Sequence, residues 1–319
     1  MGDIIGDINE SIILLTYSLL KKGNIKMKCN NGINVLSLCD GMSCGQIALK
    51  QLGIKVKEYY SYEIKKTAIK VTQLNFPNTI QLGDINEFDY DFFKDKHIDL
   101  LLCGSPCQNM SLINISGKVG INGEKSSLFY KCVEILNLVK PTYFLFENVK
   151  SMTKQDKQIF NEYLGVEPIH IDSAWFSAQS RNRYYWTNIP NIPQPVDKKI
   201  FLKDILESHP QPEETWSDKK MAFVNRKRNS TMYIRVNGDK SIPITARGYA
   251  AWNTQFIEDE NGLRDLTIKE YRRLQTIPDW YDFGDLRKSQ ITNLIGDGWT
   301  VDVIKFILDN ISSLSTVNT

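Results

Sequence analysis

Short apolar runs separated by amphipathic segments recur along the chain from residue 34 to about residue 187. The runs at 35–38 and 59–62 are typical of buried strands, and residues 46–52 between them predict a helix that ends at Gly53. Further strands are predicted at 79–82, 98–103, 143–146, 169–171 and 183–186, and a helix at 65–75 that closes before Pro77. Strands that alternate with helices predict an α/β fold with a parallel sheet covered by helices.

The pattern changes after residue 187. Prolines interrupt the chain at Pro190, Pro193, Pro195, Pro210 and Pro212, and the regular alternation of strands and helices stops. Helical patterning returns at 267–274 and 287–295, and Val303, Ile307 and Ile311 then form an apolar stripe on a last helix. We therefore expect a domain boundary near residue 187 and a smaller unit over residues 188–265.

The first 30 residues predict a helical extension. Its apolar run, 12–20, is too short to span a bilayer, and Asp3, Asp7 and Glu10 precede it where a signal peptide carries basic residues. With 319 residues and 42% hydrophobic positions, the composition predicts a globular cytoplasmic protein that does not associate with a membrane. The six cysteines lack C-x-x-C spacing and the histidines number only three, so we expect no disulfides, no metal site and no Ser-His-Asp chemistry.

Basic residues are concentrated in the region after the boundary, although the net charge of the whole chain is only +2. The cluster comprises Lys219, Lys220, Arg226, Lys227, Arg228, Arg235, Lys240, Arg247 and Arg264, with Trp216, Tyr233, Tyr249 and Trp252 among them. Clustered cations are typical of a nucleic-acid surface. The alternative is a solvated charged face, because Glu213, Glu214, Asp218 and Asp239 lie nearby.

Two strands each deliver one reactive side chain. The strand at 98–103 runs into Gly104-Ser105-Pro106-Cys107-Gln108, a turn that presents the Cys107 thiol at its tip. The strand at 143–146 ends in Glu147. Because open α/β sheets build their sites at the carboxyl ends of the strands, this pattern predicts covalent catalysis by a thiol with an acid partner.

Three carboxylates follow the first three strands in the same way. Asp40 lies in the turn 40–45, Glu63 follows the second strand, and Asp84 follows the third. Their combined charge would repel a pyrophosphate but suits a cationic nucleoside, so we expect S-adenosylmethionine, with Glu63 on the ribose and Asp84 on the adenine amine. The alternative is that these residues are ordinary caps and turn residues.

These segments together resemble the cytosine-C5 methyltransferases that act on DNA. The matching motifs, in order, are the cofactor loop 38–45, Glu63, Gly83-Asp84-Ile85, Gly104 to Gln108, Phe146-Glu147-Asn148-Val149, Gln179 to Arg183 and Ile295 to Thr300. The resemblance implies a Rossmann-like S-adenosylmethionine-dependent methyltransferase fold with a mainly parallel seven-stranded sheet. The catalytic domain would comprise residues 1–187, including the 1–30 extension, and 266–319, and residues 188–265 would form a small target-recognition domain.

The same resemblance implies the reaction: a methyl group passes from S-adenosylmethionine to C5 of a flipped cytosine in double-stranded DNA, leaving S-adenosylhomocysteine. Cys107 would add to C6 of the base, Glu147 would act as the acid, and Arg181 and Arg183 would hold the base or the adduct. The cofactor contacts would be Cys39, Asp40, Gly41, Met42, Cys44, Glu63, Ile64, Asp84, Ile85, Gly104, Pro106, Asp297, Gly298 and Trp299. The DNA contacts would be Gln108, Ser111, Lys118, Arg226, Arg228, Arg235 and Arg247.

Some motifs are closer to the vertebrate de novo enzymes than to the usual bacterial ones, notably residues 180–186 and Trp299. Two positions depart from the family pattern: Cys39 replaces a common aromatic residue, and Asp297 replaces an Asn or Arg. A monomer without an obligate protein partner is expected, in a bacterial nucleoid or a phage-infected cell, with or without a restriction enzyme.

Two other functions are alternatives to the methylation of DNA. One branch of the family modifies transfer RNA, but its Cys-Phe-Thr segment is absent from residues 188–265. A catalytically silent DNA-binding relative would not need Cys107, Glu147, Arg181 and Arg183 together.

Overall fold

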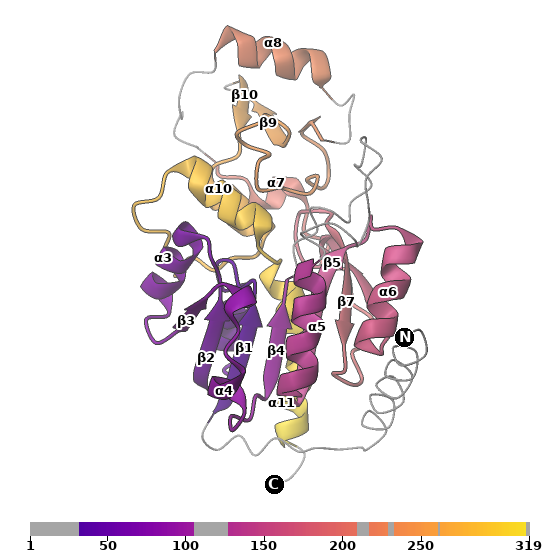
Figure 1. Cartoon of the computed structure of the whole chain (residues 1–319). Coiled ribbons are helices and arrows are strands. Elements are labelled where there is room, and N and C mark those ends of the chain that lie inside the picture. The colour runs from indigo at the N-terminus through magenta and orange to yellow at the C-terminus, as the bar shows by residue number, and fades with distance from the viewer. Residues whose placement is uncertain (1–31, 105–126, 209–216, 229–232, 261, 317–319) are drawn as a thin grey trace, which may run out of the picture.

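The computed structural model describes residues 32–104, 127–208, 217–228, 233–260 and 262–316 (Figure 1). The N-terminal extension therefore lies outside the described residues. So do five of the predicted site residues: Pro106, Cys107, Gln108, Ser111 and Lys118.

A seven-stranded sheet with strand order β3-β2-β1-β4-β5-β7-β6 forms the centre of the larger unit. Its strands are β1 (Ile33–Leu38), β2 (Val56–Tyr62), β3 (Ile80–Gly83), β4 (Leu100–Cys103), β5 (Tyr143–Val149), β6 (Ile169–Asp172) and β7 (Asn182–Thr187). Strands β1 to β5 run parallel, whereas β7 is antiparallel to both of its neighbours. The predicted mainly parallel seven-stranded sheet is confirmed.

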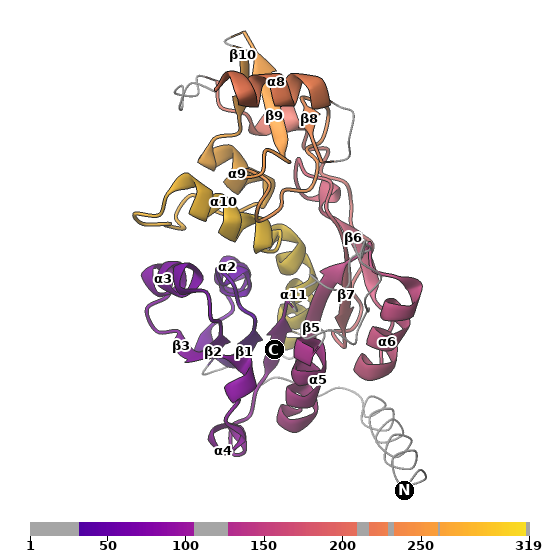
Figure 2. The ribbon, with the colours of Figure 1, turned by 45° about the horizontal axis from the view of Figure 1, so that its top comes forward.

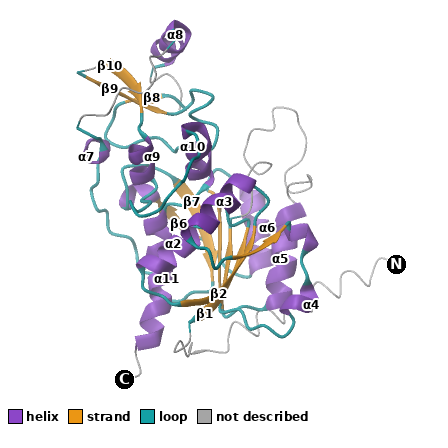
Figure 3. Ribbon diagram, turned by 90° about the vertical axis from the view of Figure 1, so that its left-hand side faces the viewer, coloured by secondary structure: helices purple, strands orange, loops and turns teal. Residues whose placement is uncertain are grey.

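Helices cover both faces of this sheet, as the side view shows (Figure 3). One face packs against α2 (Cys44–Gln51), α3 (Lys66–Asn75) and α11 (Val301–Thr316), and the other against α4 (Tyr90–Phe93), α5 (Ser127–Val139) and α6 (Lys154–Leu164). Successive side chains of a strand point to opposite faces, so Val35 enters the first core and Leu36 the second. Both faces are buried, which explains why the strands are apolar runs rather than alternating ones.

A second sheet, with strand order β10-β9-β8, forms the smaller unit. It comprises β8 (Arg235–Val236), β9 (Gln255–Asp259) and β10 (Gly262–Asp265), accompanied by α8 (Asp218–Lys227), with a core of its own around Val224 and Phe256. Helices α9 (Ile268–Leu274) and α10 (Lys288–Asp297) lie between the two sheets (Figure 2). The remaining elements are α7 (Leu202–Ile205) and two short 3-10 helices, η2 (Ile85–Glu87) and η3 (Ser173–Trp175).

The buried carboxylate of Glu270 binds the chain segments on both sides of the second sheet. Glu270 of α9 is fully buried and accepts hydrogen bonds from Arg264 Nη1 and Nη2, at 2.9 and 3.0 Å, and from the backbone N–H groups of Glu207 and Thr267. Glu207 precedes α8 and Arg264 belongs to β10, so Glu270 fixes the chain on both sides of the second sheet to α9. Among the described residues, no helix combines the length and apolar character that crossing a membrane requires.

Candidate active site

Glu147 lies near the carboxyl end of β5, and its side chain is held from two sides. Arg183 Nε donates to Oε1 at 2.7 Å, and the indole Nε1 of Trp299 donates to Oε2 at 3.1 Å. The residue is only 9% exposed. Strands β4 and β5 pair with Cys103 opposite Phe146, so Glu147 lies beside Gly104, where the predicted nucleophile segment begins. Glu147 and Gly104 therefore lie at the same edge of the sheet, and the predicted nucleophile itself, Cys107, lies outside the described residues.

The two predicted arginines have different partners. Arg183 makes the ion pair with Glu147, whereas the Arg181 guanidinium is buried among backbone carbonyls. Arg181 Nη1 donates to the Ile244 carbonyl at 2.8 Å, and Nη2 donates to those of Gly296 and Gly298 at 3.1 Å each. Arg181 thus joins the segment at residue 244 to the end of α10, while Arg183 faces the carboxylate.

The turn after β1 is organised by the Asp40 carboxylate. It accepts hydrogen bonds from the hydroxyls of Ser37, Tyr59 and Ser61, at 2.6, 2.7 and 3.1 Å, and from that of Ser43. Burial raises the pKa of Asp40, while the hydroxyl hydrogen bonds oppose this rise by stabilising the charged form. All four donors belong to β1, β2 or the turn itself, so Asp40 fixes the backbone of the loop.

The other predicted cofactor carboxylates also bind backbone groups. Glu63 Oε2 accepts from the Gly41 N–H at 2.7 Å, and Oε1 accepts from the N–H groups of Ile64 and Lys65 at 2.8 Å. Asp84 caps η2 by accepting from the Asn86 N–H at 2.9 Å. The two carboxylates follow adjacent strands, β2 and β3, as predicted.

The space around these carboxylates fits a nucleoside cofactor. Gly41 and Gly83 both have a left-handed φ, +59° and +80°, and no atom lies within 4 Å of the point where a Cβ would stand. Ile64 exposes 69% of its surface although it is a large apolar residue. An uncovered apolar side chain between open backbone positions suits the face of a purine.

The α10–α11 turn brings the last motif against the cofactor loop. Gly298 lies tightly against this loop, because a Cβ there would lie 3.1 Å from Cys44 Sγ, closer than an ordinary van der Waals contact. Asp297, which departs from the family pattern, pairs with Lys65 Nζ at 2.5 Å. The structure thus supplies Asp297 with a cationic partner from the loop after β2.

Several residues of the predicted cofactor set are buried rather than open. Met42, Cys44 and Ile85 belong to the hydrophobic cores. Burial raises the pKa of Cys44 to about 12, partly opposed by a backbone hydrogen bond from Trp299. A hydrogen bond to Cys132, together with burial, raises the pKa of Cys39. Both thiols are therefore protonated at neutral pH, which agrees with a packing role for their sulfur atoms.

The predicted DNA contacts of the smaller unit lie on its surface. Arg226 of α8, Arg235 of β8 and Arg247 are exposed. Arg228 is instead engaged by Glu258 in a bidentate pair with distances of 2.6 and 2.9 Å. Part of the basic cluster is therefore neutralised, and the acidic partner is Glu258, which the alternative interpretation of the sequence did not name.

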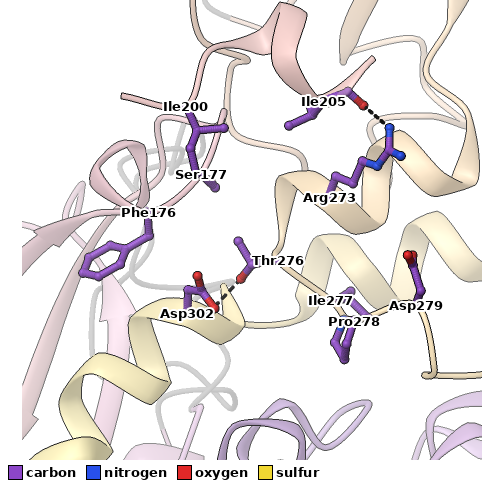
Figure 4. A pocket seen from close by; sticks show the side chains of 10 residues that line it. All are labelled: Phe176, Ser177, Ile200, Ile205, Arg273, Thr276, Ile277, Pro278, Asp279 and Asp302. Atoms are coloured by element: carbon purple, nitrogen blue, oxygen red, sulfur yellow. Dashed lines mark hydrogen bonds between the residues drawn. The ribbon is translucent and has the colours of Figure 1, made fainter. Parts of the chain in front are cut away.

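A hollow of about 350 Å³ lies away from these residues, beside α9 and the start of α11 (Figure 4). It is lined by Phe176, Ser177, Ile200, Ile205, Arg273, Thr276, Ile277, Pro278, Asp279 and Asp302. None of them belongs to the predicted catalytic, cofactor or DNA-contacting sets.

The structure adds two residues that the sequence interpretation did not assign to the site. Gln275 donates from Nε2 to the Gly298 carbonyl at 3.0 Å, and its Oε1 accepts from Thr300 Oγ1 at 2.6 Å, so it brackets Trp299. Lys65 pairs with Asp297. The contacts of Gln275 and Lys65 each join segments that are far apart in the chain, so no local sequence pattern predicts them.

Comparison with known proteins agrees with this geometry. The family model "C-5 cytosine-specific DNA methylase" matches residues 33–167 and 175–313. The Type II methyltransferase M.NlaX of Neisseria lactamica is 27% identical over 314 residues, covering 89% of this chain and 98% of its own length. M.NgoBI of Neisseria gonorrhoeae is 30% identical over 77% of this chain and 83% of its own length.

Solved structures share the fold. The methyltransferase EhMeth of Entamoeba histolytica superimposes with a TM-score of 0.72 at 15% identity, covering 88% of this chain and 98% of its own. The Dnmt2 methyltransferase of S. pombe gives 0.69 at 17% identity, with the same coverage of both chains. The Rossmann-like methyltransferase fold is thereby confirmed. The chain belongs to the C-5 cytosine-specific DNA methylase family and is a DNA cytosine-5 methyltransferase.

Proposed function

We propose that the protein transfers a methyl group from S-adenosylmethionine to C5 of a flipped cytosine in double-stranded DNA, through a covalent adduct between Cys107 and C6. The observation that carries the proposal is the Glu147 carboxylate, which is nearly buried, paired with Arg183 and adjacent to Gly104 at the start of the nucleophile segment. An acid in this position would lie beside the residue at which the nucleophile segment begins, which is what covalent catalysis by Cys107 would require.

The cofactor would lie at the carboxyl ends of β1, β2 and β3. Gly41 and Gly83 leave open space there, Ile64 offers an apolar surface, and Glu63 and Asp84 supply negative charge. When bound, S-adenosylmethionine supplies an electrophilic methyl group on a sulfonium. Asp40 acts indirectly, because its hydrogen bonds to four hydroxyls fix the turn that carries Gly41.

The residues at the ends of β4 and β5 would activate the base. C5 of cytosine is a weak nucleophile, so the Cys107 thiolate adds to C6 while Glu147 gives a proton to N3, which turns C5 into an enamine carbon. After C5 has taken the methyl group, a base removes the C5 proton, the electrons of that bond reform the C5–C6 double bond, the thiolate leaves, and N3 returns its proton to Glu147. Arg183 holds the Glu147 side chain in place through this sequence.

The DNA would approach from the side of the smaller unit. A cytosine in a duplex reaches the thiol only after it has flipped out of the stack, at a cost of about a few kcal/mol. The exposed side chains of Arg226, Arg235 and Arg247 provide cations for phosphates or base edges. We propose that residues 188–265 form the target-recognition domain and that residues 1–187 and 266–319 form the catalytic domain.

The test is methyl transfer with labelled S-adenosylmethionine to unmethylated genomic DNA, followed by bisulfite sequencing. The wild-type protein should convert cytosines in one short sequence context to 5-methylcytosine. The Cys107→Ser variant should bind the same DNA and transfer nothing, because serine is too weak a nucleophile at C6. Transfer to bulk transfer RNA but not to DNA would contradict the assigned substrate, and full activity of Cys107→Ser would contradict the assigned nucleophile.

A further inference from the structure

Trp299 contacts both sides of the proposed reaction centre. Its indole N–H donates to Glu147 Oε2 at 3.1 Å. A Cβ added to Gly104 would lie 3.1 to 3.3 Å from atoms of the same indole, so the ring lies directly against the start of the nucleophile segment. One rigid side chain therefore contacts the ends of both strands, β5 at Glu147 and β4 at Gly104.

The backbone around Trp299 is fixed by buried polar groups. Gln275 Nε2 donates to the Gly298 carbonyl, and Gln275 Oε1 accepts from Thr300 Oγ1, so one fully buried amide bonds to both neighbours of Trp299. Arg181 Nη2 also donates to the Gly298 carbonyl, at 3.1 Å. Because these hydrogen bonds fix the backbone on both sides of Trp299, the position of its indole ring is also fixed.

The hydrogen bond to Glu147 has a chemical consequence. Arg183 takes one lone pair of Oε1 and Trp299 takes one of Oε2, which uses two of the about four acceptor positions of a carboxylate and stops rotation of the group. An indole N–H is a donor only, so it orients the carboxylate without competing for the proton that the acid must deliver. Arg183 stabilises the negative charge of the Glu147 carboxylate, whereas Trp299 fixes the orientation of the carboxylate.

We propose that Trp299 is a positioning residue for methyl transfer, whose indole N–H holds the Glu147 carboxylate in the orientation that protonates the base. The inference rests on the proposed function, because it requires Glu147 to act as the acid. It goes beyond the cofactor contact predicted for Trp299, since its effect passes through a protein side chain.

A double-mutant cycle tests the proposal by single-turnover transfer of labelled methyl groups to unmethylated DNA at saturating cofactor. Trp299→Phe keeps an aromatic ring and removes the N–H, and the transfer rate should fall by about 10- to 100-fold, as for a lost hydrogen bond to a charged group. The dissociation constants for DNA and cofactor should change by less than about threefold. In a Glu147→Gln background, Trp299→Phe should cause little further loss, because its partner is already defective.

The matched control is Trp280→Phe, a half-exposed tryptophan with Lys50 Nζ 4.0 Å from the ring centroid, and it should transfer at the wild-type rate. If Trp299→Phe unfolds, benzothienylalanine at position 299 removes the N–H and keeps the shape of the ring. Losses that multiply in the cycle, or a loss confined to cofactor affinity, would overturn the positioning role. A wild-type protein that transfers no methyl group to DNA would instead refute the proposed function.

Discussion

Glu270 is a residue at which a single conservative substitution should cost several kcal/mol of stability, about the loss expected when a buried ion pair is broken. We consider Glu270→Gln, which keeps the shape of the side chain and replaces one carboxylate oxygen by an NH2 group. The native carboxylate is fully buried, and each oxygen accepts one hydrogen bond from Arg264 and one from a backbone N–H. The new NH2 group would face two donors, and the Arg264 charge would lose its buried partner.

The magnitude follows from these contacts. Two hydrogen bonds to a charged group are lost, at about 1.5–3 kcal/mol each, which gives about 3–6 kcal/mol. Breaking a buried ion pair by removing one partner costs about 3–5 kcal/mol, in the same range. Arg264 keeps its 2.9 Å contact with Asp259, so we expect the lower half of the range. The free energy of unfolding of Glu270→Gln should therefore be lower by about 3–4 kcal/mol.

Urea unfolding measures this difference. The matched control is Glu258→Gln, which breaks a similar bidentate pair with Arg228 on the exposed surface of the smaller unit and should leave the urea midpoint unchanged. Because Glu270 also ties Glu207 to α9, its variant should weaken DNA binding as well. Equal midpoints for Glu270→Gln and the wild type would refute the reasoning about buried charge.

Three further variants extend the account. Burial lowers the pKa of Lys288 to about 8 from its usual 10.5, so the folded protein binds this proton more weakly than the unfolded chain does. The buried Lys288 therefore destabilises the folded state least above pH 10.5, and this stability is lost as the pH falls through 8. Lys288→Met should therefore raise the melting temperature at pH 7 and lose that advantage near pH 10, whereas an equal gain at both would contradict the shift. Asp40→Asn, whose amide oxygen cannot accept from four hydroxyls, should weaken S-adenosylmethionine binding by about tenfold in calorimetry with the fold intact; unchanged affinity would remove Asp40 from the cofactor loop's support. DNA affinity should fall steeply with salt, and Arg226→Ala should reduce the slope of log K against log salt by about one; an unchanged slope would show that this side chain contacts no phosphate.

The fold was predictable where the sequence of a single element, such as an apolar run or a helix followed by glycine or proline, indicates its structure. The strands that became β1, β4 and β5 are apolar runs because helices cover both faces of the sheet, and glycine or proline follows the helices α2 and α3. Strand β2 begins at Val56, three residues before its prediction, because its first residues are only partly buried. Helix α8 was not predicted: only Val224 of its ten residues is buried, so it lacks an apolar stripe.

The site was predictable as a set of side chains but not as a network. Glu147 and Arg183 follow from motifs at strand ends. Nothing local in the sequence separates Arg181, which binds backbone carbonyls, from Arg183, which binds Glu147, because the difference depends on residues 244, 296 and 298. The contact of Trp299 with Glu147 joins positions 152 residues apart, and only the folded sheet brings them together.

The central claim is that Cys107 forms a bond to C6 of cytosine in DNA. DNA copied with 5-fluorocytosine in place of cytosine tests it without knowledge of the recognition sequence, because fluorine cannot leave C5 as a cation and the adduct persists after methyl transfer. With S-adenosylmethionine, the wild-type protein should form a complex with this DNA that survives denaturing electrophoresis, and Cys107→Ser should form none. A wild-type protein that methylates ordinary DNA but leaves no such complex, or a Cys107→Ser variant that forms it equally well, would contradict the claim.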